Sequence, residues 1–409
     1  MSEANRTRTT YYYERWRAVA AGTLETAGST FLLLIAVRWF ETGAFNKALV
    51  AGGGSLGLLL SPVVVTQVAA AGWPAAQAAA RILLVGAVSF LLPALVPALP
   101  MFILGSVAGM ASSAAVIPLL TQIYQENYPE QERGRRFSRT VMIRIACAAG
   151  FGKLAGDVLT GHIDYFRWLL LVFASALGFA AFCLAHCPSR PLSVDGGAHP
   201  FRALRFVRED ALFRRTLICW MLMGFANLMM LPLRVEYLAS PKYHLALKAD
   251  LIALLTTVVP NLARLVVNPL WGHLFDRMNF FALRVTLNVG FAIGILAFFV
   301  SDSFTGLILG AVVYGISNAG GDVAWSLWVT KFAPPERVAD YMSVHTFFTG
   351  VRGVLAPVVG FYCAAHFSLG LLAGLSSLLI FAATALLIPE IKFGKAARAS
   401  SALVEEVSD

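Results

Sequence analysis

Long apolar stretches alternate with short polar ones along the whole chain of 409 residues. The apolar stretches are rich in Leu, Ala, Val, Phe and Gly and run for about 20 residues, the length at which an α-helix crosses a bilayer. A transmembrane β-barrel would instead show alternating segments of about 10 residues. Because backbone groups within a membrane must be hydrogen-bonded inside the protein, this pattern predicts an all-α polytopic membrane protein.

The pattern predicts about twelve transmembrane helices. We expect them near residues 18–38, 47–69, 80–99, 102–123, 141–161, 167–186, 216–238, 250–271, 282–301, 304–329, 340–362 and 367–388. The longest polar interruption, 187–215, lies close to the middle of the chain. The predicted organisation is a cytoplasmic N-terminal segment (1–17), a six-helix bundle (18–186), a cytoplasmic central loop (187–215), a second six-helix bundle (216–388) and a cytoplasmic tail (389–409).

Weak internal repeats relate the two halves. Glu132-Arg133 before the fifth stretch aligns with Glu336-Arg337 before the eleventh. Ser61-Pro62 aligns with Asn268-Pro269, and Gly22 aligns with Gly224. Because these matches occur in the same order in both halves, they favour two pseudo-symmetric bundles.

Composition agrees with a membrane protein. Hydrophobic residues make up 58% of the chain and charged residues only 13%, against about 25% charged in soluble domains. The net charge is +9. If both termini are cytoplasmic, most Lys and Arg residues lie on the cytoplasmic segments. This bias accounts for the charge without a nucleic-acid partner. The five cysteines have no metal-ligand spacing, there is no Walker loop, and we expect no cofactor or metal.

The most informative motif lies between the eighth and ninth apolar stretches. It reads Gly272-His273-Leu274-Phe275-Asp276-Arg277 and is followed by Arg284. Together with two similar halves and a basic central loop, this pattern resembles the major facilitator superfamily of secondary transporters. The stretch from Glu132 to Arg135 resembles the basic loop that this family often has after its fourth span.

The resemblance implies transport by alternating access, with a site between the bundles lined mainly by spans one, four, seven and ten. It also implies a gating latch made of Gly272, Asp276, Arg277, Arg284, Glu132 and Arg133. The alternative is that these are ordinary solvated loop charges that set orientation. In the corresponding loop between spans two and three, Arg81 is the only matching charge.

Ionisable residues within the spans are the candidates for coupling, because charges in a membrane are costly and usually serve a function. Glu25 is the main candidate proton carrier, joined by Asp157 and Asp322. For Glu25 the alternative is a structural hydrogen bond to a neighbouring helix. Lys153 and Asp157 are four residues apart, so they can also neutralise each other on one helix face.

Arg264 is the main candidate for substrate contact, because a guanidinium can hold a carboxylate or phosphate through two hydrogen bonds. Asn261 precedes it by one turn. The alternative is an internal ion pair, for example with Asp322. The other substrate-binding candidates are Asn227, Asn318, Trp325, Lys153 and Arg352. His345 could titrate or make a core hydrogen bond.

The sequence therefore predicts a secondary active transporter rather than an enzyme. We expect it to move a small anionic or zwitterionic metabolite by proton-coupled symport or antiport. A drug/proton exporter is the alternative, followed by a non-transporting sensor or a membrane-embedded enzyme. The expected location is the bacterial inner membrane, and the expected partners are the substrate, protons and lipids, with a monomeric chain.

Overall fold

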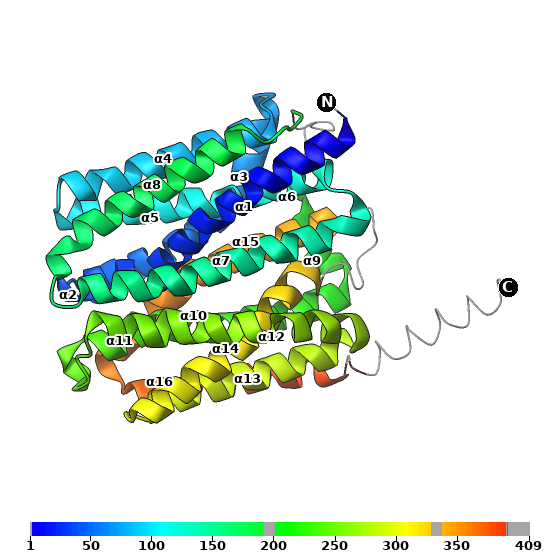
Figure 1. Ribbon diagram of the computed structural model, residues 1–409. Coiled ribbons are helices and arrows are strands. Elements are labelled where there is room, and N and C mark those ends of the chain that lie inside the picture. The colour runs from blue at the N-terminus through cyan, green and yellow to red at the C-terminus, as the bar shows by residue number, and fades with distance from the viewer. Residues whose placement is uncertain (1, 192–200, 329–337, 390, 392–409) are drawn as a thin grey trace.

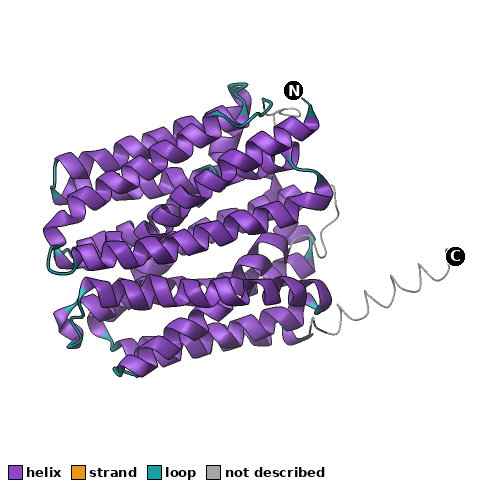
Figure 2. Cartoon of the chain, viewed as in Figure 1, coloured by secondary structure: helices purple, strands orange, loops and turns teal. Residues whose placement is uncertain are grey.

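The computed structural model describes residues 2–191, 201–328, 338–389 and 391. Within these ranges it describes all side chains except those of residues 130, 131, 133, 134, 202, 203, 272, 275–277, 323, 326, 327, 338–340 and 343. In the described part, long helices cross the molecule side by side (Figure 1). Short loops join them, and no strand is present among the described residues (Figure 2).

Six rods of helix make up the first half. They are α1 (Glu3–Thr26) continued by the π-helical turn η1 (Ala27–Phe31) and α2 (Leu32–Arg38), α3 (Ala44–Ala70), α4 (Ala75–Leu95), α5 (Leu99–Ala115) continued by α6 (Ile117–Asn127), α7 (Glu130–Leu159) and α8 (Phe166–Ala185).

The second half repeats this arrangement after the short helix α9 (Phe206–Glu209). Its rods are α10 (Ala211–Ala239), α11 (Ala249–Ala253) continued by the π-helical turn η5 (Leu254–Val258) and α12 (Val259–Arg277), α13 (Phe280–Val300), α14 (Phe304–Leu327), α15 (Val338–His366) and α16 (Leu369–Ala385).

These rods confirm the all-α polytopic fold. Ten described helical stretches are long and apolar enough to cross a membrane. The other two predicted spans are helical as well. Helix α7 begins with a charged segment that lowers its hydropathy, and α16 has 17 residues.

Side-chain caps keep the connections short. Asn279 accepts hydrogen bonds from the backbone N–H groups of Phe281 and Ala282 at the start of α13, and Ser303 caps α14 in the same way. Such caps satisfy donors that the first helical turn leaves free. The eighth predicted span ends near residue 271, before Asp276 and Arg277. Instead α12 continues through both residues, and only Met278 and Asn279 separate it from α13.

The first helix begins well before the apolar stretch predicted near 18–38. Residues 1–17 are polar, but α1 already begins at Glu3. Thr7 Oγ1 donates to the carbonyl of Asn127, 2.6 Å away, and the buried Glu14 accepts from the hydroxyl of Tyr124. Because these polar groups have partners on α6, the segment packs against the first half as helix.

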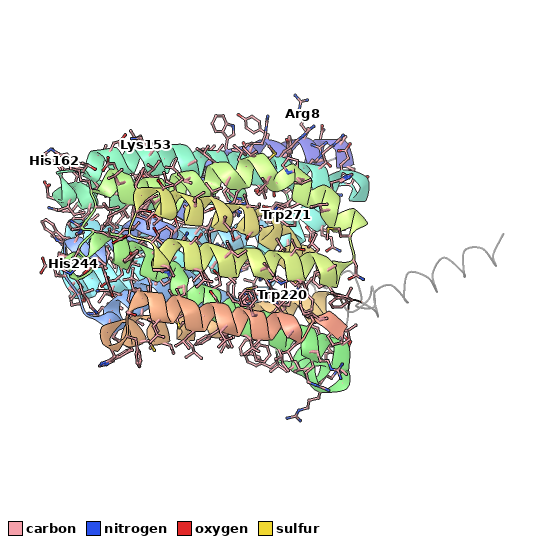
Figure 3. All side chains as sticks on the ribbon, turned by 90° about the horizontal axis from the view of Figure 1, so that it is seen from below. Arg8, Lys153, His162, Trp220, His244 and Trp271 are labelled. Carbon is pink, nitrogen blue, oxygen red and sulfur yellow. The ribbon has the colours of Figure 1, made fainter. Side chains whose placement is uncertain are left out.

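The two halves lie side by side, with α3 packed along α15 and α7 packed against α11, η5 and α12. Helix α1 begins and α16 ends at the same end of the molecule, which we call the terminal end (Figure 1). The opposite end, called the far end, carries the loops 39–43, 160–165 and 240–248. His162 and His244 lie at the far end in Figure 3.

Candidate functional site

An ion-pair network lies where the two halves meet. Arg264 on α12 donates from Nη1 to Glu25 Oε1 on α1, at 2.5 Å, and to Asn261 Oδ1, at 2.6 Å. Its Nη2 donates to Asp322 Oδ2 on α14, at 2.6 Å. One guanidinium therefore joins a helix of the first half to two helices of the second.

A second arginine completes the network. Arg144 on α7 has its Nε 3.1 Å from Glu25 Oε2, so Glu25 lies between two arginines. The two arginines and the carboxylates of Glu25 and Asp322 sum to no net charge. Charges at this depth are tolerated when they are paired in this way. Arg144 was not among the site residues predicted from sequence.

The members of the network differ in exposure. The side chain of Arg264 is only 5% exposed, whereas those of Glu25, Arg144 and Asp322 are 25%, 34% and 40% exposed. The guanidinium of Arg264 is therefore enclosed by protein, whereas part of each side chain of Glu25, Arg144 and Asp322 is exposed. Charged groups in a membrane protein normally turn such an exposed part to a water-filled space, where a proton or a substrate can reach them.

Two glycines bring the helices of the network together. A Cβ on Gly22 would lie 2.4 Å from the carbonyl oxygen of Arg144, so α7 can approach α1 one turn before Glu25. A Cβ on Gly315 would lie 2.4 Å from the carbonyl oxygen of Pro260, so α12 can approach α14. Any side chain at either glycine would push apart the helices that carry the charged groups.

The two π-helical turns touch each other beside the network. Thr30 Oγ1 in η1 lies 2.7 Å from Thr256 Oγ1 and 2.6 Å from Thr257 Oγ1 in η5, and all three residues are buried. Isolated π-turns often mark functional sites. The hydropathy and spacing of the residues do not predict this contact. The only signal in the sequence is the presence of threonines within apolar stretches.

Further bonds between the halves lie at the far end. Lys47 Nζ is 2.6 Å from Glu236 Oε1, and Arg38 Nη2 donates to the carbonyl of Leu247 at 2.8 Å. The backbone N–H of Asp250 donates to Thr160 Oγ1 at 2.9 Å. For the described residues, the hydrogen bonds and ion pairs between the two six-rod halves lie in the network or on its far-end side. These bonds hold the two halves together at the far end in this conformation.

Several predicted site residues lie outside the network. Lys153 and Asp157 form an ion pair with each other, and their side chains are about half exposed; Lys153 lies at the edge of the molecule in Figure 3. Arg352 is buried in the second half, where its Nη1 donates to the carbonyl of Trp220. Trp325 packs against His345, with ring centroids 5.6 Å apart.

Two further predicted site residues, Asn318 and Asn227, lie on helices next to the network. Asn318 is half-buried on α14, one turn before Asp322 and on the same face. Asn227 on α10 lines a cavity of about 10 Å³ together with Arg234 and Tyr314. The volume suffices for about one water molecule, which could serve the Asn227 Oδ1 and Arg234 Nη1 atoms that lack a hydrogen-bond partner among the described groups.

The predicted latch residues are only partly described. Glu132 pairs with Arg136 at 2.6 Å and with Arg135 at 3.5 Å. The hydrogen bond and charge of Arg136 hold the pKa of Glu132 below its usual value. The side chains of Arg133, Gly272, Asp276 and Arg277 lie outside the described part of the structure, so their contacts stay predictions.

Arg284 does not lie at a loop surface, as the predicted latch would require. Because α13 begins at Phe280, Arg284 is in the second turn of the helix and inside the bundle, where it is fully buried. Its guanidinium carbon lies 3.7 Å from the ring centroid of Trp220, and its Nη2 donates to Met223 Sδ. The described contacts of Arg284 are therefore within the second half rather than at a loop surface.

Comparison with known sequences gives one match to a family model, and it covers the second half of the chain. Residues 237–405 match the sequence model of the Major Facilitator Superfamily. No curated protein sequence gives a significant match.

Solved structures of transporters share the whole architecture. A single-residue mutant of the nucleoside transporter NupG superposes with a TM-score of 0.74 at 13% identity, over 93% of this chain and 99% of that one. A D-xylose–proton symporter gives 0.66 at 15% identity, over 94% and 96%. The human organic anion transporter MFSD10 gives 0.66 at 14% identity, over 95% and 100%. At these identities the likeness concerns the fold and does not extend to the substrate.

Proposed function

We propose that this chain, whose residues 237–405 match the model of the Major Facilitator Superfamily, is a proton-coupled secondary transporter of a small anionic or zwitterionic metabolite. The observation that carries the proposal is the Arg264 guanidinium, shared between Glu25 and Asp322 at the junction of the two halves. A ligand shifts a conformational equilibrium only through contacts that differ between the states, and Arg264 makes its bonds to Glu25 and Asp322 where the two halves meet.

The charge balance suggests how a proton and an anion can be coupled. When Glu25 takes up a proton, Arg264 loses one of its two anionic partners. A carboxylate or phosphate of the substrate can then occupy the vacated donors, because guanidinium groups bind such anions strongly. The network returns to zero net charge only when the proton and the anion are bound together. This arrangement favours symport, or the exchange of one bound anion for another.

The far end, where bonds hold the two halves together, fits one state of such a cycle. The placement of Lys and Arg supports cytoplasmic termini, and we propose that orientation, with the central loop 187–215 on the same side. The bonds of Lys47 and Arg38 to the second half then close the outer side. We further propose a monomer in a bacterial inner membrane, surrounded by lipids.

A drug/proton exporter is the second candidate. The observation that favours it is the exposure of both carboxylates, 25% for Glu25 and 40% for Asp322, since an open carboxylate attracts an organic cation. In that case the substrate would bind Asp322 or Glu25, and Arg264 would act only as a counter-charge. The two candidates differ in what happens when Arg264 is removed.

Flux into proteoliposomes tests the proposal. We expect uptake of an anionic substrate to rise when a pH gradient is imposed. The Glu25→Gln variant should lose this dependence but keep counterflow exchange, because the site still binds substrate. Arg264→Gln should lose anion binding, whereas a cation exporter would keep its binding.

A suitable control is Asp164→Asn, since Asp164 is exposed in the far-end turn. This variant should transport as the wild type does. Unchanged pH dependence in Glu25→Gln would remove Glu25 from coupling. If a broad panel of metabolites and drugs gave neither flux nor thermal stabilisation, the transport proposal itself would be wrong.

A further inference from the structure

Three basic side chains converge on Trp220 in the interior of the second half. The guanidinium of Arg284 lies over its ring at 3.7 Å, and Arg352 Nη1 donates to its backbone carbonyl. The ring of His345 is 5.2 Å from the Trp220 ring, centroid to centroid. Arg284 and His345 are completely buried, and Arg352 is 8% exposed. The cluster joins α10, α13 and α15 in the half of the molecule towards the terminal end (Figure 3).

The cluster holds several hydrogen-bond donors that no described protein group satisfies. Arg284 Nε and Nη1, Arg352 Nε and Trp220 Nε1 have no partner among the described residues, and neither has either ring nitrogen of His345. No ion pair between described residues includes Arg284 or Arg352. Burying an arginine without a counter-charge is unfavourable. Here one buried arginine lies over the indole of Trp220 and a second donates to the backbone carbonyl of the same residue.

The internal repeat supplies no carboxylate at the position of the second half that matches Glu25. In the first half, Gly22 contacts α7, and three residues later Glu25 pairs with Arg144 from that helix. In the second half, the matching Gly224 contacts Arg352, since a Cβ there would lie 2.0 Å from Nη1. The residue three positions later is Asn227, which is neutral. At the shift that aligns Glu132 with Glu336, Arg352 matches Ala148, which also lies against the glycine of its half. The second half therefore has a guanidinium where the first half has a methyl group, and an amide where the first half has the carboxylate of Glu25.

We propose that a monoatomic anion of the halide class, such as chloride, binds between Arg284, Arg352 and Trp220. The unsatisfied groups of Arg284, Arg352 and Trp220 are all N–H donors, which suits an anion and excludes a cation. Complete burial of Arg284 and His345 excludes an organic acid of metabolite size. The bound ion neutralises one guanidinium and ties together three helices of the second half. This site is separate from the Glu25–Arg264 network.

The thermal stability of the purified full-length protein tests the site. Sodium gluconate is replaced stepwise by sodium chloride or bromide at constant ionic strength, and the melting temperature is followed. A ligand that binds the folded state stabilises it by mass action, so we expect a saturable rise of at least about 2 °C. Equal melting temperatures in gluconate, chloride and bromide would overturn the proposal.

Variants of two arginines test whether a halide-dependent rise in melting temperature comes from binding at this cluster. Arg284→Gln should remove it. Arg81→Gln should keep it, because Arg81 also stacks on a tryptophan, Trp73, at 4.1 Å but lies outside the cluster. A rise of the same size in Arg284→Gln would mean that halide acts elsewhere and would refute the site. If Arg284→Gln does not fold, Trp220→Phe serves instead, since it removes only one donor and should weaken halide binding several-fold.

A crystallographic readout is independent of stability. Crystals grown in bromide should show an anomalous peak within hydrogen-bond distance of Arg284 Nε or Nη1. A carboxylate at that position instead would show that the chain supplies its own counter-charge and would also overturn the proposal.

Discussion

At the scale of single residues, Arg264 and its carboxylate partners are not equivalent. Arg264 serves Glu25 and Asp322 at once, while Glu25 has a second cation in Arg144. Removing one partner of a buried pair leaves the other uncompensated, at a cost of about 3–5 kcal/mol. We expect Arg264→Gln to destabilise the protein by about 2–3 kcal/mol, because its partners are partly exposed. Glu25→Gln and Asp322→Asn should each cost less, as judged by melting temperature in detergent.

A double variant tests the same coupling. Glu25 keeps Arg144 as a partner in Arg264→Gln, so the charge that this variant leaves behind is relieved by removing Asp322. Asp322→Asn/Arg264→Gln should therefore be more stable than Arg264→Gln alone. Residues in one ion-pair network typically deviate from additivity by about 0.5–3 kcal/mol. Strictly additive losses would show that the two residues do not interact in the folded protein.

At the scale of helices, the contact between η1 and η5 offers a second prediction. Thr30→Val keeps the shape of the side chain but removes both hydrogen bonds to η5. Each such bond is worth about 1 kcal/mol, so the loss of both should make amide exchange in 27–31 and 254–258 about 30-fold faster. Hydrogen–deuterium exchange with mass spectrometry measures this directly.

The control lies in the same rod. Thr23 Oγ1 bonds only to the Val19 carbonyl of its own helix, so Thr23→Val should leave exchange in 254–258 unchanged. If Thr30→Val accelerated η1 but not η5, the two turns would not support each other.

The helices could be predicted from the sequence, whereas most contacts between helices could not. A stretch of about 20 apolar residues can satisfy its backbone in lipid only as helix, so the rods followed from hydropathy. The start of α1 at Glu3 did not, because Thr7 and Glu14 are tolerated through partners on α6 that hydropathy cannot detect.

Side-chain pairing in the site was predictable only in part. The sequence offers a bond between Arg264 and Asp322 as the alternative to substrate contact, and the structure contains this bond. The bond from Arg264 to Glu25 joins residues 239 positions apart, and periodicity within one helix carries no information about such a contact. The same limit applies to Arg284, whose charge resembles a loop latch in sequence but lies against Trp220.

At the scale of the whole molecule, the two halves are held together at the far end by contacts between them. The ion pair of Lys47 and Glu236 is the most enclosed charged contact there, with side chains only 15% and 9% exposed. Lys47→Met leaves Glu236 without its cation, which raises the free energy of the closed state relative to the open one. A change of about 1 kcal/mol alters the ratio of two such states about fivefold.

Spin labels at the exposed His162 and His244 report on this equilibrium, since they lie on different halves at the far end. In a background without the five cysteines, we expect pulsed electron resonance to show one short distance for the parent protein. Lys47→Met should add a population at longer distance, and the swap Lys47→Glu/Glu236→Lys should reduce it again. Lys242→Met is the matched control, because Lys242 Nζ donates to the Ala364 carbonyl within the second half. An equal effect of both methionine variants, or none of Lys47→Met, would mean that this ion pair does not hold the far end closed.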